Sequence, residues 1–69
     1  MEFIFTRHAK EKMDCLGYAP SEVKETIVKG MKIGPDSRGN MHARMGTLEV
    51  VFRKLDQKVV VITVFEVKR

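Results

Sequence analysis

The chain has 69 residues, a mass of 7.9 kDa and a net charge of +4, which predicts one small domain over residues 1–69. Its apolar runs are too short for a membrane-spanning helix, and Cys15, the only cysteine, excludes a disulfide scaffold or a cysteine-built zinc site within one chain. The stretch Met1–Lys12 is too charged for a signal peptide, so we expect a cytoplasmic protein.

The positive charge is concentrated in the second part of the chain. Residues 1–28 carry four Lys or Arg and five Asp or Glu, a balance of −1, whereas residues 29–69 carry nine and four, a balance of +5. Such an asymmetry predicts a polyanionic partner, either nucleic acid or an acidic protein segment. The alternative is an ordinary solvated surface with surplus lysines.

The chain should begin with a strand and a helix. Glu2–Phe5 is rich in Phe and Ile and predicts a short strand at a sheet edge. Thr6 is a favoured N-cap for a helix over Arg7–Leu16, and Gly17 should end it. The apolar stripe of this helix has i, i+4, i+7 spacing and consists of Ala9, Met13 and Leu16. His8 falls on the flank of that stripe, at the border between core and solvent.

A second helix should begin at Pro20, whose missing N–H costs nothing in the first helical turn. Tyr18 and Val23 have the spacing of a hydrophobic staple across that start, and Gly30 marks the end within a residue or two. The apolar face has i, i+4, i+8 spacing and consists of Val23, Ile27 and Met31. The two helices therefore predict a helical hairpin.

The rest of the chain predicts strands. Gly34–Asn40 is a turn-rich loop, after which the apolar period changes to two over residues 41–45 and 47–54. Val59–Val67 is apolar on both faces, so it should lie between the 47–54 strand and the N-terminal strand. The sequence thus predicts an α+β fold of order β-α-α-β-β-β, a helical hairpin packed on an antiparallel sheet.

The residues offer little to hold a cofactor. A metal site would need a third good ligand near His8 and His42, and nothing is spaced to supply it. Glycine-rich phosphate loops of the GxxxxGK[ST] or GxGxxG kind are absent from the sequence. We therefore expect neither a metal nor a cofactor.

One face of the predicted sheet should be cationic. If the apolar positions of the 41–45 strand face the helices, the opposite face carries His42, Arg44, Arg53 and Thr63. Guanidinium groups bind phosphate oxygens through forked N–H pairs, and imidazole exchanges a proton near neutral pH. This set of side chains suits a phosphate-centred site.

The same residues also allow a purely structural interpretation. Arg44 and Arg53 could be solvated side chains that pair with Glu49 or Glu66 across strands, each pair contributing a fraction of a kcal/mol. Spacing alone leaves both interpretations open.

The segment Phe5-Thr6-Arg7-His8-Ala9-Lys10-Glu11-Lys12-Met13 resembles the opening signature, [FY]-[ST]-x-H-A-x-x-[RK]-[MI], of a family of small prokaryotic proteins with a domain of unknown function. Later elements of that family are matched by Gly17, Ser21-Glu22-Val23, Asp36-Ser37-Arg38-Gly39 and Val60–Phe65, so the resemblance covers nearly the whole chain. The family is similar in element order to the RelE-like toxin fold, whose best-known members cleave messenger RNA without a metal. One departure is Lys12, where Arg is common, because a lysine lacks the planar fork.

The resemblance implies two alternative functions. The first is a metal-independent endoribonuclease toxin of a toxin–antitoxin pair, in which the 2′-hydroxyl of the RNA attacks the adjacent phosphorus. In that scheme His8 or Glu66 takes the proton, and the charge that develops is neutralised by Arg44, Arg53 and Lys12. The second is a non-catalytic domain that binds RNA or a protein, with His8 packed against the sheet.

The expected partners follow from these two functions. In the enzymatic interpretation the substrate is bound by Lys12, His42 and Thr63. RNA or the ribosome and an acidic antitoxin-like protein are the expected partners, and a membrane is not. The sequence leaves open whether the chain forms a homo-oligomer.

Overall fold

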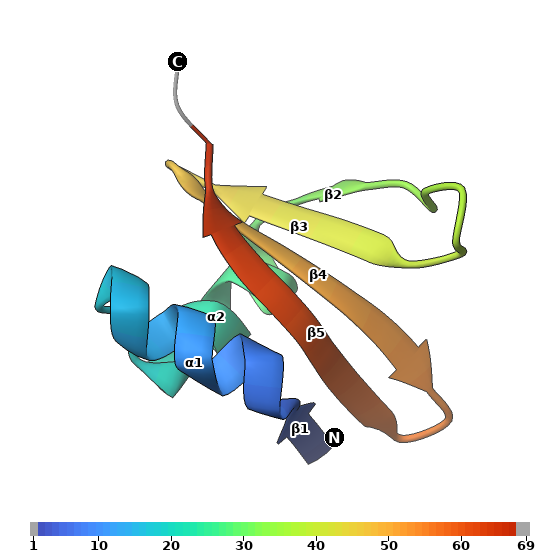
Figure 1. Cartoon of the computed structure of the whole chain (residues 1–69). Coiled ribbons are helices and arrows are strands. Elements are labelled where there is room, and N and C mark those ends of the chain that lie inside the picture. Colours follow the sequence, from blue (N-terminus) through green and yellow to red (C-terminus); the bar gives the residue numbers. More distant parts are fainter. Residues whose placement is uncertain (1, 68–69) are drawn as a thin grey trace.

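The computed structural model describes residues 2–67, which form two helices and one five-stranded sheet (Figure 1). The elements in chain order are β1 (Glu2–Phe5), α1 (Arg7–Leu16), α2 (Pro20–Lys29), β2 (Met31–Ile33), β3 (Met41–Met45), β4 (Leu48–Leu55) and β5 (Lys58–Glu66). The strands are arranged in the order β1-β5-β4-β3-β2. The α+β fold class and the order of the predicted elements are confirmed. Neither helix has the length and apolarity needed to cross a membrane.

Local capping explains why the helices begin and end where the sequence predicts. The Thr6 hydroxyl accepts the Ala9 N–H at 3.1 Å and donates to the carbonyl of Ile62 at 2.9 Å, so this cap also ties α1 to β5. Gly17 adopts a left-handed conformation, with φ of 81°, and ends α1. The Glu22 carboxylate accepts the Ala19 N–H at 3.0 Å and satisfies one free donor at the start of α2.

The predicted position of the last strand is confirmed. β5 lies between β4, with which it pairs antiparallel, and β1, with which it pairs parallel. The sheet is therefore mixed, whereas a wholly antiparallel sheet was predicted. The parallel pair arises because two helices separate β1 from the later strands, and a long crossover is what parallel pairing requires.

A fifth strand was not predicted. Met31 was expected on the apolar face of the second helix, but α2 ends at Lys29, and Met31 begins β2 with 63% of its surface exposed. Gly30 explains this change of direction, because a Cβ there would lie 2.4 Å from the Thr26 carbonyl oxygen and 2.7 Å from that of Arg44. The chain passes so close to β3 that only glycine fits, and β2 then pairs with β3.

The two faces of the sheet differ in what covers them. Both helices bury side chains in one core, in which Ala9 and Met13 of α1 and Val23 and Ile27 of α2 join inward-facing strand residues, chiefly Ala43, Val50, Phe52, Val61 and Val64. We call this side of the sheet the core face. The residues that alternate with these point to the other side, the open face, which carries His42, Arg44, Glu49, Val51, Arg53 and Thr63.

A register shift in β5 decides which of its polar residues reach the open face. Val51 pairs with Thr63 and Phe52 pairs with Val61, so Ile62 is an extra residue in β5. The bulge places Thr63 on the open face. Alternation then continues along β5, so Val64 points into the core, and Glu66 lies on the same side as its register partner Leu48. A pattern of strict alternation does not reveal this shift.

Candidate functional site

A nearly buried carboxylate organises the open face. Glu49 on β4 is only 6% exposed, and its Oε1 accepts two hydrogen bonds from Arg44, from Nε at 3.1 Å and from Nη2 at 2.9 Å. Its other oxygen, Oε2, lies 2.7 Å from the His42 Nδ1. Arg44 and Glu49 are direct cross-strand partners, which is why alternation places them together. A buried charge needs such partners, and Glu49 has them on both oxygens.

The second ring nitrogen of His42 extends the network into the β2–β3 loop. The His42 Nε2 lies 2.8 Å from the Asp36 Oδ2, while the Asp36 Oδ1 accepts the backbone N–H groups of Arg38 and Asn40 at 2.9 and 3.0 Å. Because both ring nitrogens face carboxylate oxygens, the doubly protonated imidazolium satisfies both contacts. We call this chain of four side chains the open-face network, and it consists of Asp36, His42, Glu49 and Arg44.

The charges of the network shift its titration in consistent directions. Hydrogen bonds to Asp36 and then to Glu49 raise the pKa of His42 above its usual 6.5. The same bond from His42 is the main reason that the pKa of Asp36 falls to about 2. Burial by itself would raise the pKa of Glu49, but hydrogen bonds from His42 and Arg44 outweigh it and lower that pKa. The network therefore favours the charged form of each of the three groups.

In this network Arg44 is the partner of a carboxylate in the same protein and not a free cation. When His42 is protonated, the negative charges of Asp36 and Glu49 balance the positive charges of His42 and Arg44. The cross-strand pairing of Arg44 with Glu49, one of the two interpretations that the sequence allowed, is present in the structure. Sequence reasoning gave no role to Asp36. A local signal for such a role is that Asp36 lies in the turn-rich segment Gly34–Asn40, directly before the strand that carries His42.

Arg53 and Thr63 lie on the same open face. The exposed Arg53 donates from Nη2 to the carbonyl oxygen of Arg38 at 3.1 Å. Thr63 on β5 pairs with Val51 on β4, which pairs with His42 on β3, so these three side chains form one row across the sheet. The structure thus places Arg44, Arg53, His42 and Thr63 on a common face.

His8 and Lys12 lie on α1, beside β5. Thr6, two residues before His8, is anchored to the carbonyl of Ile62, which puts the exposed His8 close to the edge of β5. β3 is two strands further, about 10 Å at the usual strand spacing. Within residues 2–67, no hydrogen bond or ion pair connects His8 to Arg44 or Arg53. The structure therefore does not join His8 directly to the arginines.

Glu66 lies apart from the other predicted site residues. Its Oε2 accepts a hydrogen bond from the Tyr18 hydroxyl at 3.0 Å, on the side of the sheet that carries the helices. The expectation that Glu66 shares a site with Arg44 and Arg53 is wrong in geometry, because the extra residue Ile62 turns Glu66 away from the open face.

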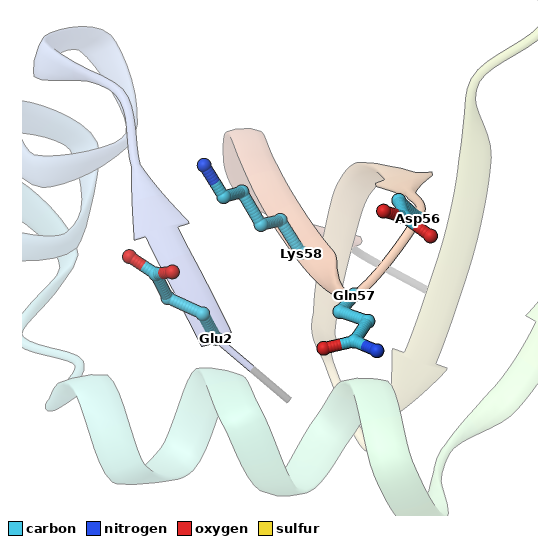
Figure 2. A pocket seen from close by; sticks show the side chains of 4 residues that line it. All are labelled: Glu2, Asp56, Gln57 and Lys58. Atoms are coloured by element: carbon cyan, nitrogen blue, oxygen red, sulfur yellow. The ribbon is translucent and has the colours of Figure 1, made fainter.

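Among the surface hollows described for residues 2–67, one is lined by a predicted site residue. The largest described hollow, about 510 Å³, lies at the β4–β5 turn and is lined by Glu2, Asp56, Gln57 and Lys58. Figure 2 shows that Glu2 and Lys58 extend to one side while Asp56 and Gln57 point elsewhere, so the four side chains do not converge on a ligand. A smaller hollow of about 270 Å³ lies beside Arg44 and is lined by Met31, Arg44, Gly46 and Val67. In the described part of the chain, no group of three His, Cys, Asp or Glu side chains could hold a metal ion.

Comparison with known proteins identifies the fold and the family. The crystal structure of the RelBE2 toxin–antitoxin complex from Mycobacterium tuberculosis contains a chain with a similar fold, at a TM-score of 0.64 and 20% sequence identity, and the match covers 94% of this chain and 95% of that chain. No curated protein matches the sequence. The model of a domain of unknown function, DUF4258, matches residues 5–66. The chain therefore belongs to the DUF4258 family and has a RelE-like fold.

Proposed function

We propose that this domain is the toxin of a toxin–antitoxin pair, a metal-independent endoribonuclease that acts on RNA in the cytoplasm as a single domain. The observation that carries the proposal is the basic open face of a RelE-like fold, because a similar fold occurs in a chain of a toxin–antitoxin complex. The balance of +5 in residues 29–69 supports a polyanionic substrate and an acidic protein partner.

The proposed reaction needs no cofactor. The 2′-hydroxyl of the RNA attacks the adjacent phosphorus, the bond to the 5′-oxygen of the next nucleotide breaks, and a 2′,3′-cyclic phosphate forms. Arg53 stabilises the negative charge that develops on the phosphorus oxygens. Arg44 lies on the same face of the sheet and is held by Glu49. His8 at the sheet edge accepts the 2′-hydroxyl proton, and Lys12, one turn further along α1, adds positive charge. The departing 5′-oxygen takes a proton from water and leaves as a 5′-hydroxyl.

His42 has a different part in this scheme. Both of its ring nitrogens are engaged by carboxylates, so it has no free nitrogen to accept a proton from the substrate. We therefore assign to it the orientation of Glu49 and, through Glu49, of Arg44. Thr63, in the same row, contributes a hydroxyl to the floor of the site.

The test is RNA cleavage by the purified protein with and without ribosomes. His8→Ala should reduce cleavage by about 10²–10⁴-fold with the fold intact, because general acid–base groups contribute that much. Arg53→Ala should reduce it by about 10²–10³-fold through lost charge stabilisation. Lys10→Ala removes one charge from an exposed position of α1 and serves as the matched control. Full activity of both site variants would contradict the assignment.

A non-catalytic interaction domain is the second candidate. The observation that favours it is the internal compensation of the open-face network, which leaves Arg44 paired and both His42 nitrogens engaged. Tight RNA or protein binding by a preparation that cleaves no RNA, even with ribosomes present, would favour this candidate.

A further inference from the structure

Two arginines that are distant in sequence meet at one corner of the open face. Arg53 on β4 donates to the backbone carbonyl of Arg38, which lies in the loop between β2 and β3. Both residues are exposed. The hydrogen bond fixes the guanidinium of Arg53 against the loop that carries the second guanidinium.

The loop that carries Arg38 is held in a defined shape. The Asp36 carboxylate accepts hydrogen bonds from the backbone N–H groups of Arg38 and Asn40. The backbone N–H of Asp36 donates to the Asn40 carbonyl at 2.9 Å. Gly39, with φ of 81°, closes the turn and donates to the Asp36 carbonyl at 3.0 Å. His42 holds the same carboxylate from the sheet. The backbone of Arg38 is thus positioned before any ligand arrives, which lowers part of the entropic cost of binding.

The positive charge of this corner is not compensated within the protein. None of the ion pairs among residues 2–67 includes Arg38 or Arg53. The nearest carboxylate of the loop, that of Asp36, is already taken by His42 and two backbone N–H groups. Arg44, by contrast, is paired with Glu49. Among these three arginines, the uncompensated positive charge therefore lies at Arg38 and Arg53 and not at Arg44.

We propose that Arg38 and Arg53 together bind one phosphodiester group of single-stranded RNA. The inference rests on the proposed function and adds Arg38 as a residue that binds the substrate. Two guanidinium forks can hold the oxygens of one phosphate from two sides, and such charge-assisted bonds are roughly twice as strong as neutral ones. Contacts to phosphate fix the position of the strand without reading its bases. The site therefore anchors the strand irrespective of sequence.

Binding of a 2′-O-methyl RNA strand, measured by fluorescence anisotropy over a range of salt concentrations, tests this site without cleavage, because the strand lacks the attacking hydroxyl. Arg38→Ala and Arg53→Ala should each weaken binding about tenfold and lower the log–log salt slope by about 0.7. The double variant should lose less than the product of the two effects, since both residues hold one phosphate. Arg53→Lys should keep the salt slope while affinity falls, because the charge remains and the fork is lost.

Lys10→Ala, with the same loss of one charge at another exposed position, is the control, and arginine variants that match it would overturn the site. A second readout separates this site from the proposed function. In the wild-type protein, the Nε–H resonances of Arg38 and Arg53 should both shift on titration with inorganic phosphate. If the RNA does not bind but both resonances shift, the proposed function fails and the phosphate site stands. If neither resonance shifts, the site is overturned.

Discussion

At the scale of single residues, the open face depends on Glu49. This carboxylate is almost fully buried and is stabilised by three hydrogen bonds from two cationic side chains. Removing one donor leaves part of a buried charge without a partner, and such a loss costs more than the pair contributes when it is intact.

Arg44→Ala should therefore lower the free energy of unfolding by about 1–3 kcal/mol. Arg53→Ala removes an exposed arginine whose contact is a single bond to a carbonyl, and it should change stability by less than about 0.5 kcal/mol. Urea unfolding of both variants checks the difference. Equal effects on stability would show that Glu49 does not depend on Arg44.

Stability should also depend on pH through the network. The pKa of His42 is raised, so its contribution is complete below its unfolded value of about 6.5 and is lost as the pH rises through its folded pKa. The pKa of Asp36 is lowered from 3.8 to about 2, so its contribution is complete above 3.8 and is lost as the pH falls towards 2. The midpoint of denaturant unfolding, measured over pH 2–9, should be highest between pH 3.8 and about 6.5, where both contributions are complete. His42→Gln should remove the alkaline decline, and a decline that persists in that variant would assign it to another group.

The sequence predicts part of this residue-scale picture. Alternation along the 41–45 strand places His42 and Arg44 on one face, and a short hairpin brings Glu49 opposite Arg44. The contact between Asp36 and His42 depends on how a seven-residue loop folds back, and residue spacing does not encode that path. The sequence therefore indicates the cationic residues and allows the pairing of Arg44 with Glu49, but it does not reveal Asp36 as the second partner of His42.

At the scale of elements, local signals and long-range geometry differ in how well they can be predicted. The bounds of α1 and the start of α2 follow from caps that lie within a few residues of each helix end. β2 was missed because a strand of three exposed residues has no alternation to detect. The bulge at Ile62, which exchanges the faces that Thr63 and Glu66 would have under strict alternation, depends on the pairing of β4 with β5 and cannot be detected in the sequence of β5 alone.

The Thr6 hydroxyl both caps α1 and ties it to β5, and substitutions at this position test that double role. Thr6→Ala removes the bond to the Ala9 N–H and the bond to the Ile62 carbonyl, and it should lower the free energy of unfolding by about 1–2 kcal/mol. Thr6→Ser keeps the hydroxyl and should retain most of that stability. Thermal unfolding with hydrogen exchange of α1 checks both, and an alanine variant as stable as the serine variant would contradict the double role.

At the scale of the whole molecule, fold and charge lead to the same proposal. The RelE-like fold leaves one sheet face uncovered, and residues 31–66, which span β2 to β5, carry six Lys or Arg against four Asp or Glu, a balance of +2. Composition was enough to predict a polyanionic partner. Composition could not show that the network consumes the charge of Arg44 and leaves that of Arg38 and Arg53 free, because burial and pairing decide which charges remain available.

The chemical identity of the ends of cleaved RNA tests the central claim most directly. Attack by the 2′-hydroxyl leaves a 2′,3′-cyclic phosphate on one fragment and a 5′-hydroxyl on the other, and it cannot occur where the 2′-oxygen is methylated. We predict such ends on RNA treated with the wild-type protein, and no cleavage at a methylated position. Fragments with 3′-hydroxyl ends, or RNA that stays intact with and without ribosomes, would contradict the account.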